Sequence, residues 1–156
     1  MKKIVVAIAI LLLCTFPVFN EKTESKFINV ENVEIINITV TEAWEMLQSE
    51  DDGIQIPVDV RTFQEYFTER IATPHFYDKP RLYPLQLIEK QPFTKLFTVL
   101  FKGKEIILYC RTAHRSYIAA NLLLENNFEG TLYNMVGGIT AWKAAGLPTV
   151  KGFGWG

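Results

Sequence analysis

Short apolar runs alternate with longer amphipathic stretches over most of this chain. The runs are rich in β-branched and aromatic side chains, as is typical of strands, and they cover residues 34–38, 54–60, 105–109 and 131–136. Helical periodicity or helix-start signals fall between and after them, at residues 39–47, 63–67, 85–101, 116–126 and 138–145. Strands that alternate with helices predict an α/β fold with a mostly parallel central sheet of about five strands, flanked by helices on both faces.

Prolines modify this pattern at three places. Pro57 has no N–H to donate to a strand ladder, so we expect the first half of the run at residues 54–60 to be frayed or bulged. Pro92 interrupts the helical stretch or restarts it. Residues 71–83 contain two prolines and end before a third, so we expect that segment to be irregular.

The first residues form a separate unit. Two lysines precede an apolar stretch at residues 4–19, which is typical of a secretory signal peptide or a short membrane anchor. As a helix this stretch would rise about 24 Å, short of the roughly 30 Å of a bilayer core. No small-x-small cleavage pattern follows it, so both forms stay open. We interpret residues 1–19 as the export segment, 20–33 as a linker, 34–150 as the domain and 151–156 as a tail.

This organisation predicts an exported protein, periplasmic or extracellular, that contacts a membrane only through the N-terminal segment. Its length of 156 residues allows one well-buried domain. The net charge is -1 and no basic run is present, so we expect no nucleic-acid partner. We interpret Cys14 as one of the apolar residues of the export segment.

Cys110 is the main candidate for chemistry. It ends the apolar run at residues 105–109 and is followed by a short polar loop and a predicted helix. At such a turn, backbone N–H groups and the positive end of the helix dipole lie close to the thiol. The loop also carries Arg111 and Arg115. These features lower a thiol pKa, so we interpret Cys110 as a nucleophile. It is the only cysteine of the predicted domain, so no disulfide within the domain is expected.

Three motifs in order resemble the rhodanese-like (sulfurtransferase) family over roughly residues 34–150. They are D-V-R at 59–61 with E-Y at 65–66, then Y-C-R-T-A-H-R-S at 109–116, and finally G-G at 137–138 with Trp142 and G-L-P at 146–148. The resemblance implies a single rhodanese-like domain whose cysteine carries a persulfide. The thiolate takes a sulfane sulfur from a small anionic donor such as thiosulfate and passes it to a thiol or a cyanide-like acceptor.

The resemblance also suggests roles for neighbouring residues. The loop from Cys110 to Arg115 is expected to curl its N–H groups toward the sulfur, and its residues are the candidate substrate-binding set: Arg111, Thr112, Ala113, His114 and Arg115. Arg111 is expected to hold the anionic end of the donor, and Arg115 the anion or the loop. Asp59, Arg61 and Glu65 are interpreted as a supporting ion-paired set. Neither a cofactor nor a metal site is expected.

Two alternatives stay open. Ala113 stands where the family usually has glycine, and alanine at a positive φ would be strained by about 1 kcal/mol or more, which favours a non-catalytic binding or regulatory module. A cysteine-dependent phosphatase or arsenate reductase is less favoured. Those enzymes use C-x5-R, whereas Cys110 and Arg115 are spaced as C-x4-R, a smaller loop that suits sulfur.

Overall fold

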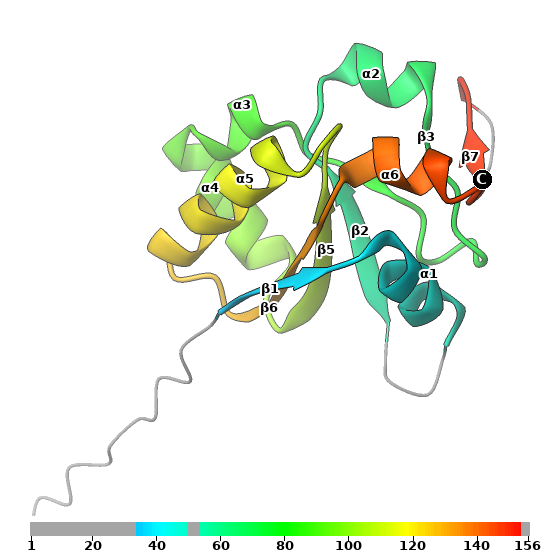
Figure 1. Cartoon of the computed structure of the whole chain (residues 1–156). Coiled ribbons are helices and arrows are strands. Elements are labelled where there is room, and N and C mark those ends of the chain that lie inside the picture. Colours follow the sequence, from blue (N-terminus) through cyan, green and yellow to red (C-terminus); the bar gives the residue numbers. More distant parts are fainter. Residues whose placement is uncertain (1–33, 50–53, 154–156) are drawn as a thin grey trace, which may run out of the picture.

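The computed structural model describes residues 34–49 and 54–153. Five strands form one parallel sheet, shown in Figure 1, in the order β1 (Ile35–Ile38), β6 (Gly130–Met135), β5 (Lys104–Tyr109), β2 (Gln55–Asp59) and β4 (Arg81–Leu82). This confirms the predicted five-stranded parallel sheet. The predicted export segment and linker lie outside the described residues.

Helices cover both faces of the sheet, as the sequence predicts (Figure 1). One face carries α3 (Leu85–Ile88), α4 (Gln91–Leu100) and α5 (His114–Glu125), and the other carries α1 (Val40–Gln48) and α6 (Gly138–Ala144). The short helix α2 (Phe63–Thr68) follows β2 and lies beyond the carboxyl ends of the strands.

Alternating side chains of β5 supply both halves of the core. Ile106 and Leu108 pack under α3, α4 and α5, whereas Ile107 and Tyr109 pack under α1 and α6. This period of two is the geometry of a strand, and both faces are apolar because both are covered. The sequence therefore shows a continuous apolar run that leads directly to Cys110.

The fraying or bulge expected in the first half of the strand at Pro57 is absent on the side of β5. β2 pairs with β5 in unbroken register from Gln55 to Asp59. On its other side β2 pairs with β4 only at Val58 and Asp59. Pro57 therefore has a strand neighbour on one side only, a position where a missing N–H is tolerated.

Other elements differ in detail from the sequence predictions. The stretch 85–101 is two helices, with Pro92 in the first turn of the second. Within the segment expected to be irregular, β4 joins the sheet edge, and β3 (Arg70–Ile71) pairs antiparallel with β7 (Thr149–Val150). Thr39 and Glu42 form a capping box at the start of α1. Among residues 34–49 and 54–153, no helix is both long and apolar enough to cross a bilayer.

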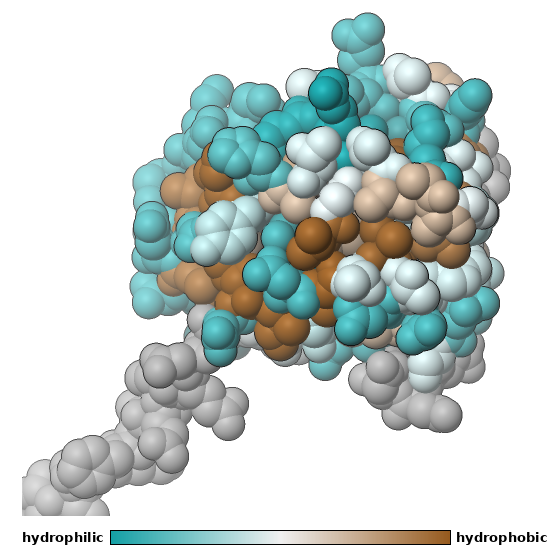
Figure 2. Space-filling model, viewed as in Figure 1, coloured by the Kyte–Doolittle hydropathy of each residue, from teal (hydrophilic) through white to brown (hydrophobic). Residues whose placement is uncertain are grey.

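The surface is polar at the end of the molecule where the strands finish. Figure 2 shows hydrophilic side chains around α2, whereas hydrophobic ones gather across the middle of the same face, along β1. Ile36 of β1 and Val136, just after β6, are both about half exposed. The polar end carries the loop after β5, where parallel α/β sheets bind ligands.

Candidate active site

Cys110 immediately follows β5 and begins the loop that leads into α5. Its side chain is only 1% exposed, and it belongs to the core cluster under α5. The strand before it is held in place up to its last residue, because the N–H of Val60 donates to the carbonyl of Tyr109 at 3.0 Å. The thiol is therefore fixed at the carboxyl edge of the sheet.

The loop curls around the sulfur as the sequence predicts. Burial acts to raise the pKa of Cys110, but hydrogen bonds from the backbone N–H groups of Ser116, Thr112 and Arg115 and from the Ser116 hydroxyl outweigh it. The hydroxyl oxygen of Ser116 lies 3.8 Å from Sγ. The pKa of Cys110 is lowered as a result. A buried thiol ringed by N–H donors therefore forms the thiolate more readily than an ordinary cysteine.

Ala113 adopts the left-handed conformation that its place in the motif requires. Its φ is 80° and its ψ is -8°, and it is the N-cap residue of α5. Its carbonyl accepts from the N–H of Tyr117 at 3.0 Å, so the strained residue starts the helix directly. A residue with a Cβ is less stable in this conformation than glycine by about 1 kcal/mol or more of conformational free energy.

The start of α6 braces the loop from the opposite face of the sheet. The N–H groups of Ile139 and Thr140 donate to the carbonyls of Cys110 and Arg111 at 2.9 and 3.1 Å. Gly138 makes this approach possible, since a Cβ there would lie 2.4 Å from the Cys110 carbonyl oxygen. The carbonyls of Cys110 and Arg111 thereby point toward α6, on the side of the loop away from the N–H groups that face the sulfur.

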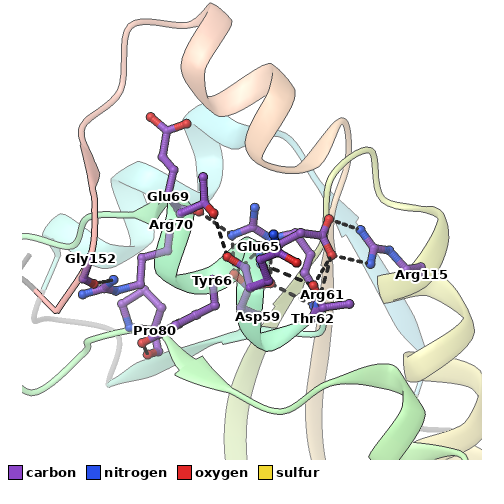
Figure 3. A network of polar contacts seen from close by, with 12 residues as sticks. Asp59, Arg61, Thr62, Glu65, Tyr66, Glu69, Arg70, Pro80, Arg115 and Gly152 are labelled. Carbon is purple, nitrogen blue, oxygen red and sulfur yellow. Dashed lines mark hydrogen bonds and ion pairs between the residues drawn. The ribbon is translucent and has the colours of Figure 1, made fainter.

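Arg115 is committed to Glu65 of α2, as Figure 3 shows. Its two terminal nitrogens donate to the two carboxylate oxygens at 2.8 and 2.6 Å. Glu65 also closes the capping box of α2 by accepting from the backbone N–H and the hydroxyl of Thr62. The bond from Arg115 is the main cause that lowers the pKa of Glu65 to about 2, against burial. This bidentate pair holds the active loop to α2.

Asp59 and Arg61 form a separate buried pair at the end of β2 (Figure 3). Nε of Arg61 donates to Oδ1 of Asp59 at 2.9 Å and Nη2 to Oδ2 at 2.5 Å, and Nη2 also reaches the Glu69 carbonyl at 2.8 Å. The expected set of three is thus two pairs, because the carboxylate of Glu65 is turned toward the loop after β5. The Glu65–Arg115 pair holds the cysteine loop, whereas the Asp59–Arg61 pair fixes the chain between β2 and Glu69.

The remaining loop side chains lie at the surface. Arg111, Thr112 and His114 are exposed. Arg111 lines an open pocket of about 460 Å³ between α2 and α6, whose other walls include Gln64, Thr68, Ile139, Thr140 and Lys143. Its lining also carries charges of both signs: the cations are Arg61, Arg111 and Lys143, and the carboxylates are Glu65 and Glu69. Arg61 and Lys143 are paired with Asp59 and Glu69. Within the described part of the chain, no group of three or more His, Cys, Asp or Glu side chains is placed to hold a metal ion.

Three residues at the site were not predicted as site residues from the sequence. The Ser116 hydroxyl contacts the sulfur, and Oδ1 of Asn134 accepts from that hydroxyl at 2.8 Å. Gly138 has no side chain, which lets the start of α6 lie close to the cysteine loop. A signal existed for Asn134, because it lies on the same buried face of β6 as Leu132. A buried polar side chain in a core strand needs a partner.

The sequence model of the Rhodanese-like domain family matches residues 39–145 of this chain. The chain belongs to the rhodanese-like domain family. The match begins at the N-cap of α1 and ends just after α6, so it includes the cysteine loop and both elements that brace it. The predicted resemblance is confirmed.

Several proteins are similar in sequence. An uncharacterised protein of Synechocystis sp. is 34% identical over 115 residues, which span 74% of this chain and 57% of that protein. An uncharacterised protein of Rickettsia rickettsii is 30% identical over 125 residues, which span 74% of this chain and 98% of that protein. A protein of Allochromatium vinosum named sulfurtransferase is 41% identical over 49 residues, or 31% of this chain and 45% of that protein.

Solved structures show the same fold. The rhodanese-like domain of an Anabaena sp. protein superposes with a TM-score of 0.60 at 23% identity, covering 76% of this chain and 80% of that one. A thiosulfate sulfurtransferase of Pseudomonas aeruginosa superposes with a TM-score of 0.59 at 19% identity, covering 76% of this chain and 20% of that one. At these identities the likeness establishes the architecture.

Proposed function

We propose that this protein is a sulfurtransferase that carries a sulfane sulfur on Cys110. The Cys110 thiolate attacks the outer sulfur of a donor such as thiosulfate, the donor's S–S bond breaks, and sulfite leaves with the bonding electron pair. A thiol or cyanide-like acceptor then attacks the outer sulfur of the persulfide. The S–S bond to Cys110 breaks in turn, and the thiolate is restored.

The observation that carries this proposal is the ring of donors around the sulfur. The N–H groups of Thr112, Arg115 and Ser116 stabilise a negative sulfur in a site that is almost closed to water. Because they are backbone groups fixed by a helix start, they need no reorganisation when charge develops on the sulfur. Removing one such donor in enzyme sites costs about 2.7–4 kcal/mol of transition-state stabilisation.

The cation beside the cysteine supports a small anionic donor. Arg111 is exposed directly beside the cysteine, and Lys143 lies across the same pocket. Lys143 is paired with Glu69, so Arg111 is the better candidate to hold the sulfite end of the donor. Thr112 and Arg115 serve through their backbone N–H groups.

The geometry disfavours oxyanion chemistry of the phosphatase kind. Only four residues separate Cys110 from Arg115. Both terminal nitrogens of Arg115 already donate to Glu65, so its guanidinium supports the loop and is not turned to a tetrahedral ligand. A loop of this size suits one additional sulfur atom.

Mass spectrometry of the intact protein tests the proposal. A Cys14→Ser variant leaves Cys110 as the single thiol, and exposure to thiosulfate is expected to add about 32 Da to it. Adding a thiol acceptor is expected to remove this mass, and the Cys110→Ser variant should gain none.

The strained Ala113 favours one alternative, a non-catalytic rhodanese-like binding or regulatory module. The same experiment separates the two functions. A correctly folded protein that gains no mass from thiosulfate or from an inorganic polysulfide would favour the module.

A further inference from the structure

A line of polar side chains runs from Cys110 to the edge of the sheet. The Ser116 hydroxyl lies 3.8 Å from Sγ and 2.8 Å from Oδ1 of Asn134. Nδ2 of Asn134 donates in turn to Oδ1 of Asn37 at 2.8 Å. Asn37 and Asn134 are directly opposite in the β1–β6 ladder. Ser116 and Asn134 are buried, whereas Asn37 is exposed, so the line connects the thiol to solvent.

The Ser116 hydroxyl has one hydrogen and three acceptors within reach. They are Sγ of Cys110, Oδ1 of Asn134 and, at 3.1 Å, the carbonyl of Ala113. An amide oxygen cannot donate, so the short contact to Asn134 uses the hydroxyl's only hydrogen. In that arrangement the neutral thiol donates its own hydrogen to the hydroxyl oxygen, and every group in the line is satisfied.

Ionisation of Cys110 reverses this requirement. The thiol proton leaves to solvent, and a thiolate can only accept. The hydroxyl hydrogen is then needed at Sγ, and the hydroxyl oxygen needs a donor from Asn134. A half-turn of the Asn134 amide exchanges its oxygen for its NH2 group at almost the same position. The amide oxygen then faces Asn37, which must turn in the same way to donate.

We propose that Asn134 and Asn37 are positioning residues whose amides turn together, so that the Ser116 hydroxyl serves both the neutral and the ionised sulfur. This inference deepens the proposed function, on which it rests, because the thiolate is the form of Cys110 that attacks the donor, and the two amides would make the step from neutral thiol to thiolate easier. The exposed end makes the turn inexpensive, since water can replace any partner that Asn37 loses. A buried line without such an end would leave one orientation unsatisfied.

Charged groups also surround the thiol, but their described bonds do not run through this line. Arg115 interacts with the Cys110 charge and is paired with Glu65 of α2. Asp59 and Arg61 are paired at the end of β2. Arg111 of the loop is exposed. The electrostatic effect of these groups on the thiol does not depend on how the two amides are turned. Asn134 and Asn37 act on the thiol only by deciding where the Ser116 hydroxyl points its hydrogen.

An Asn37→Asp variant tests the proposal, because a carboxylate can only accept. It would hold Nδ2 of Asn134, keep Oδ1 on the Ser116 hydroxyl, and deny the hydroxyl hydrogen to the thiolate. The pKa of Cys110 is measured from the pH dependence of its alkylation by iodoacetamide, in a Cys14→Ser background. We expect Asn37→Asp to raise the pKa of Cys110 by about 1, a tenfold smaller thiolate fraction well below the pKa.

Two matched variants separate this effect from the added charge. Ser116→Ala removes the hydroxyl, so Asn37→Asp in that background is expected to raise the pKa by less than about 0.3, which is the direct charge effect through water. The uncharged Asn37→Leu is expected to cause no rise. If Ser116→Ala does not fold, the Asn37→Asp protein is measured in about 1 M salt, which screens an exposed charge and leaves the hydrogen-bond effect.

Equal rises in both backgrounds, a rise abolished by salt, or no rise at all would overturn the proposal. The titration uses no sulfur donor, so it gives an answer even if Cys110 transfers no sulfur. Conversely, a persulfide on Cys110 with no effect of Asn37→Asp would leave the proposed function intact and reject the positioning role alone.

Discussion

The backbone at Ala113 has a φ of 80°, a conformation that glycine adopts without penalty. The residue still occupies it because both of its neighbouring segments are fixed. Cys110 immediately follows the central strand β5, and the N–H of Tyr117 donates the first bond of α5 to the Ala113 carbonyl. A single strained residue is therefore held by the packing around it, at a cost to stability.

Replacing Ala113 with glycine is expected to relieve this strain. We expect Ala113→Gly to raise the free energy of unfolding by about 0.5–1 kcal/mol, measured by chemical denaturation. The matched control is Ala144→Gly in α6, which lies in helical backbone and should lower it by about 0.5–1 kcal/mol. A fall in stability for Ala113→Gly would contradict the strain at this residue.

At the scale of elements, two helices determine the shape of the cysteine loop. α6 approaches from one side through Gly138, and α2 holds the other side through Glu65 and Arg115. Each contact joins segments far apart in the sequence, so the loop geometry depends on the assembled fold. Changes in either helix are therefore expected to act on the thiol.

The approach of α6 is tested by adding one methyl group. Gly138→Ala would place a Cβ 2.4 Å from the Cys110 carbonyl oxygen, whereas Gly146→Ala would meet nothing within 4 Å. Both glycines have positive φ, so both variants lose about 1 kcal/mol of stability to backbone strain. Only Gly138→Ala should also displace the cysteine loop. We expect it to lose roughly a further 1–3 kcal/mol of stability and to slow the alkylation of Cys110 at neutral pH. Similar results for the two variants would exclude the close contact as the cause.

The α2 contact predicts a pH dependence of stability. The folded pKa of Glu65 is about 2, below the ordinary 4.5, so the ionised form is favoured in the folded state. Its contribution is complete above about pH 4.5 and is lost as the pH falls toward 2. We expect Glu65→Gln to lower the free energy of unfolding at pH 7 by about 1 kcal/mol. The variant should also lose less stability than the unmodified protein as the pH falls from about 4.5 to about 2.

The partner of Glu65 provides the control for this prediction. In an Arg115→Gln background, Glu65→Gln should have a much smaller effect, because the ion pair is already broken. Stability is measured by denaturation between roughly pH 2 and 7. Equal effects of Glu65→Gln in both backgrounds would show that the Glu65–Arg115 pair is not the cause of the pH dependence of stability.

At the scale of the whole molecule, the sequence predicted the architecture but not all of its connections. The alternation of apolar runs and helices identified the parallel sheet, and the motif around Cys110 placed the site at its carboxyl edge. β4 is only two residues long and has no visible periodicity. The Glu65–Arg115 pair spans 50 residues, and no local pattern indicates which acid an arginine will meet. Those features depend on tertiary packing.

Export of the whole protein is a proposal that rests on the pattern of residues 1–19. If this segment is a cleaved signal peptide, protein recovered from its host should lack the mass of about the first 19 residues; if it is an anchor, the mass is complete and the protein is in the membrane fraction. Deleting residues 2–19 should retain the protein in the cytoplasm. Full-length protein in the soluble cytoplasmic fraction would contradict export.

The most direct test of the site is the titration of its thiol. The rate at which iodoacetamide alkylates Cys110 is measured against pH in the Cys14→Ser variant, with Cys110→Ser as the unlabelled control. The ring of N–H donors predicts a pKa clearly below the roughly 8.5 of an ordinary thiol. A value at or above 8.5 in the folded protein would contradict a sulfur held ionised by these donors.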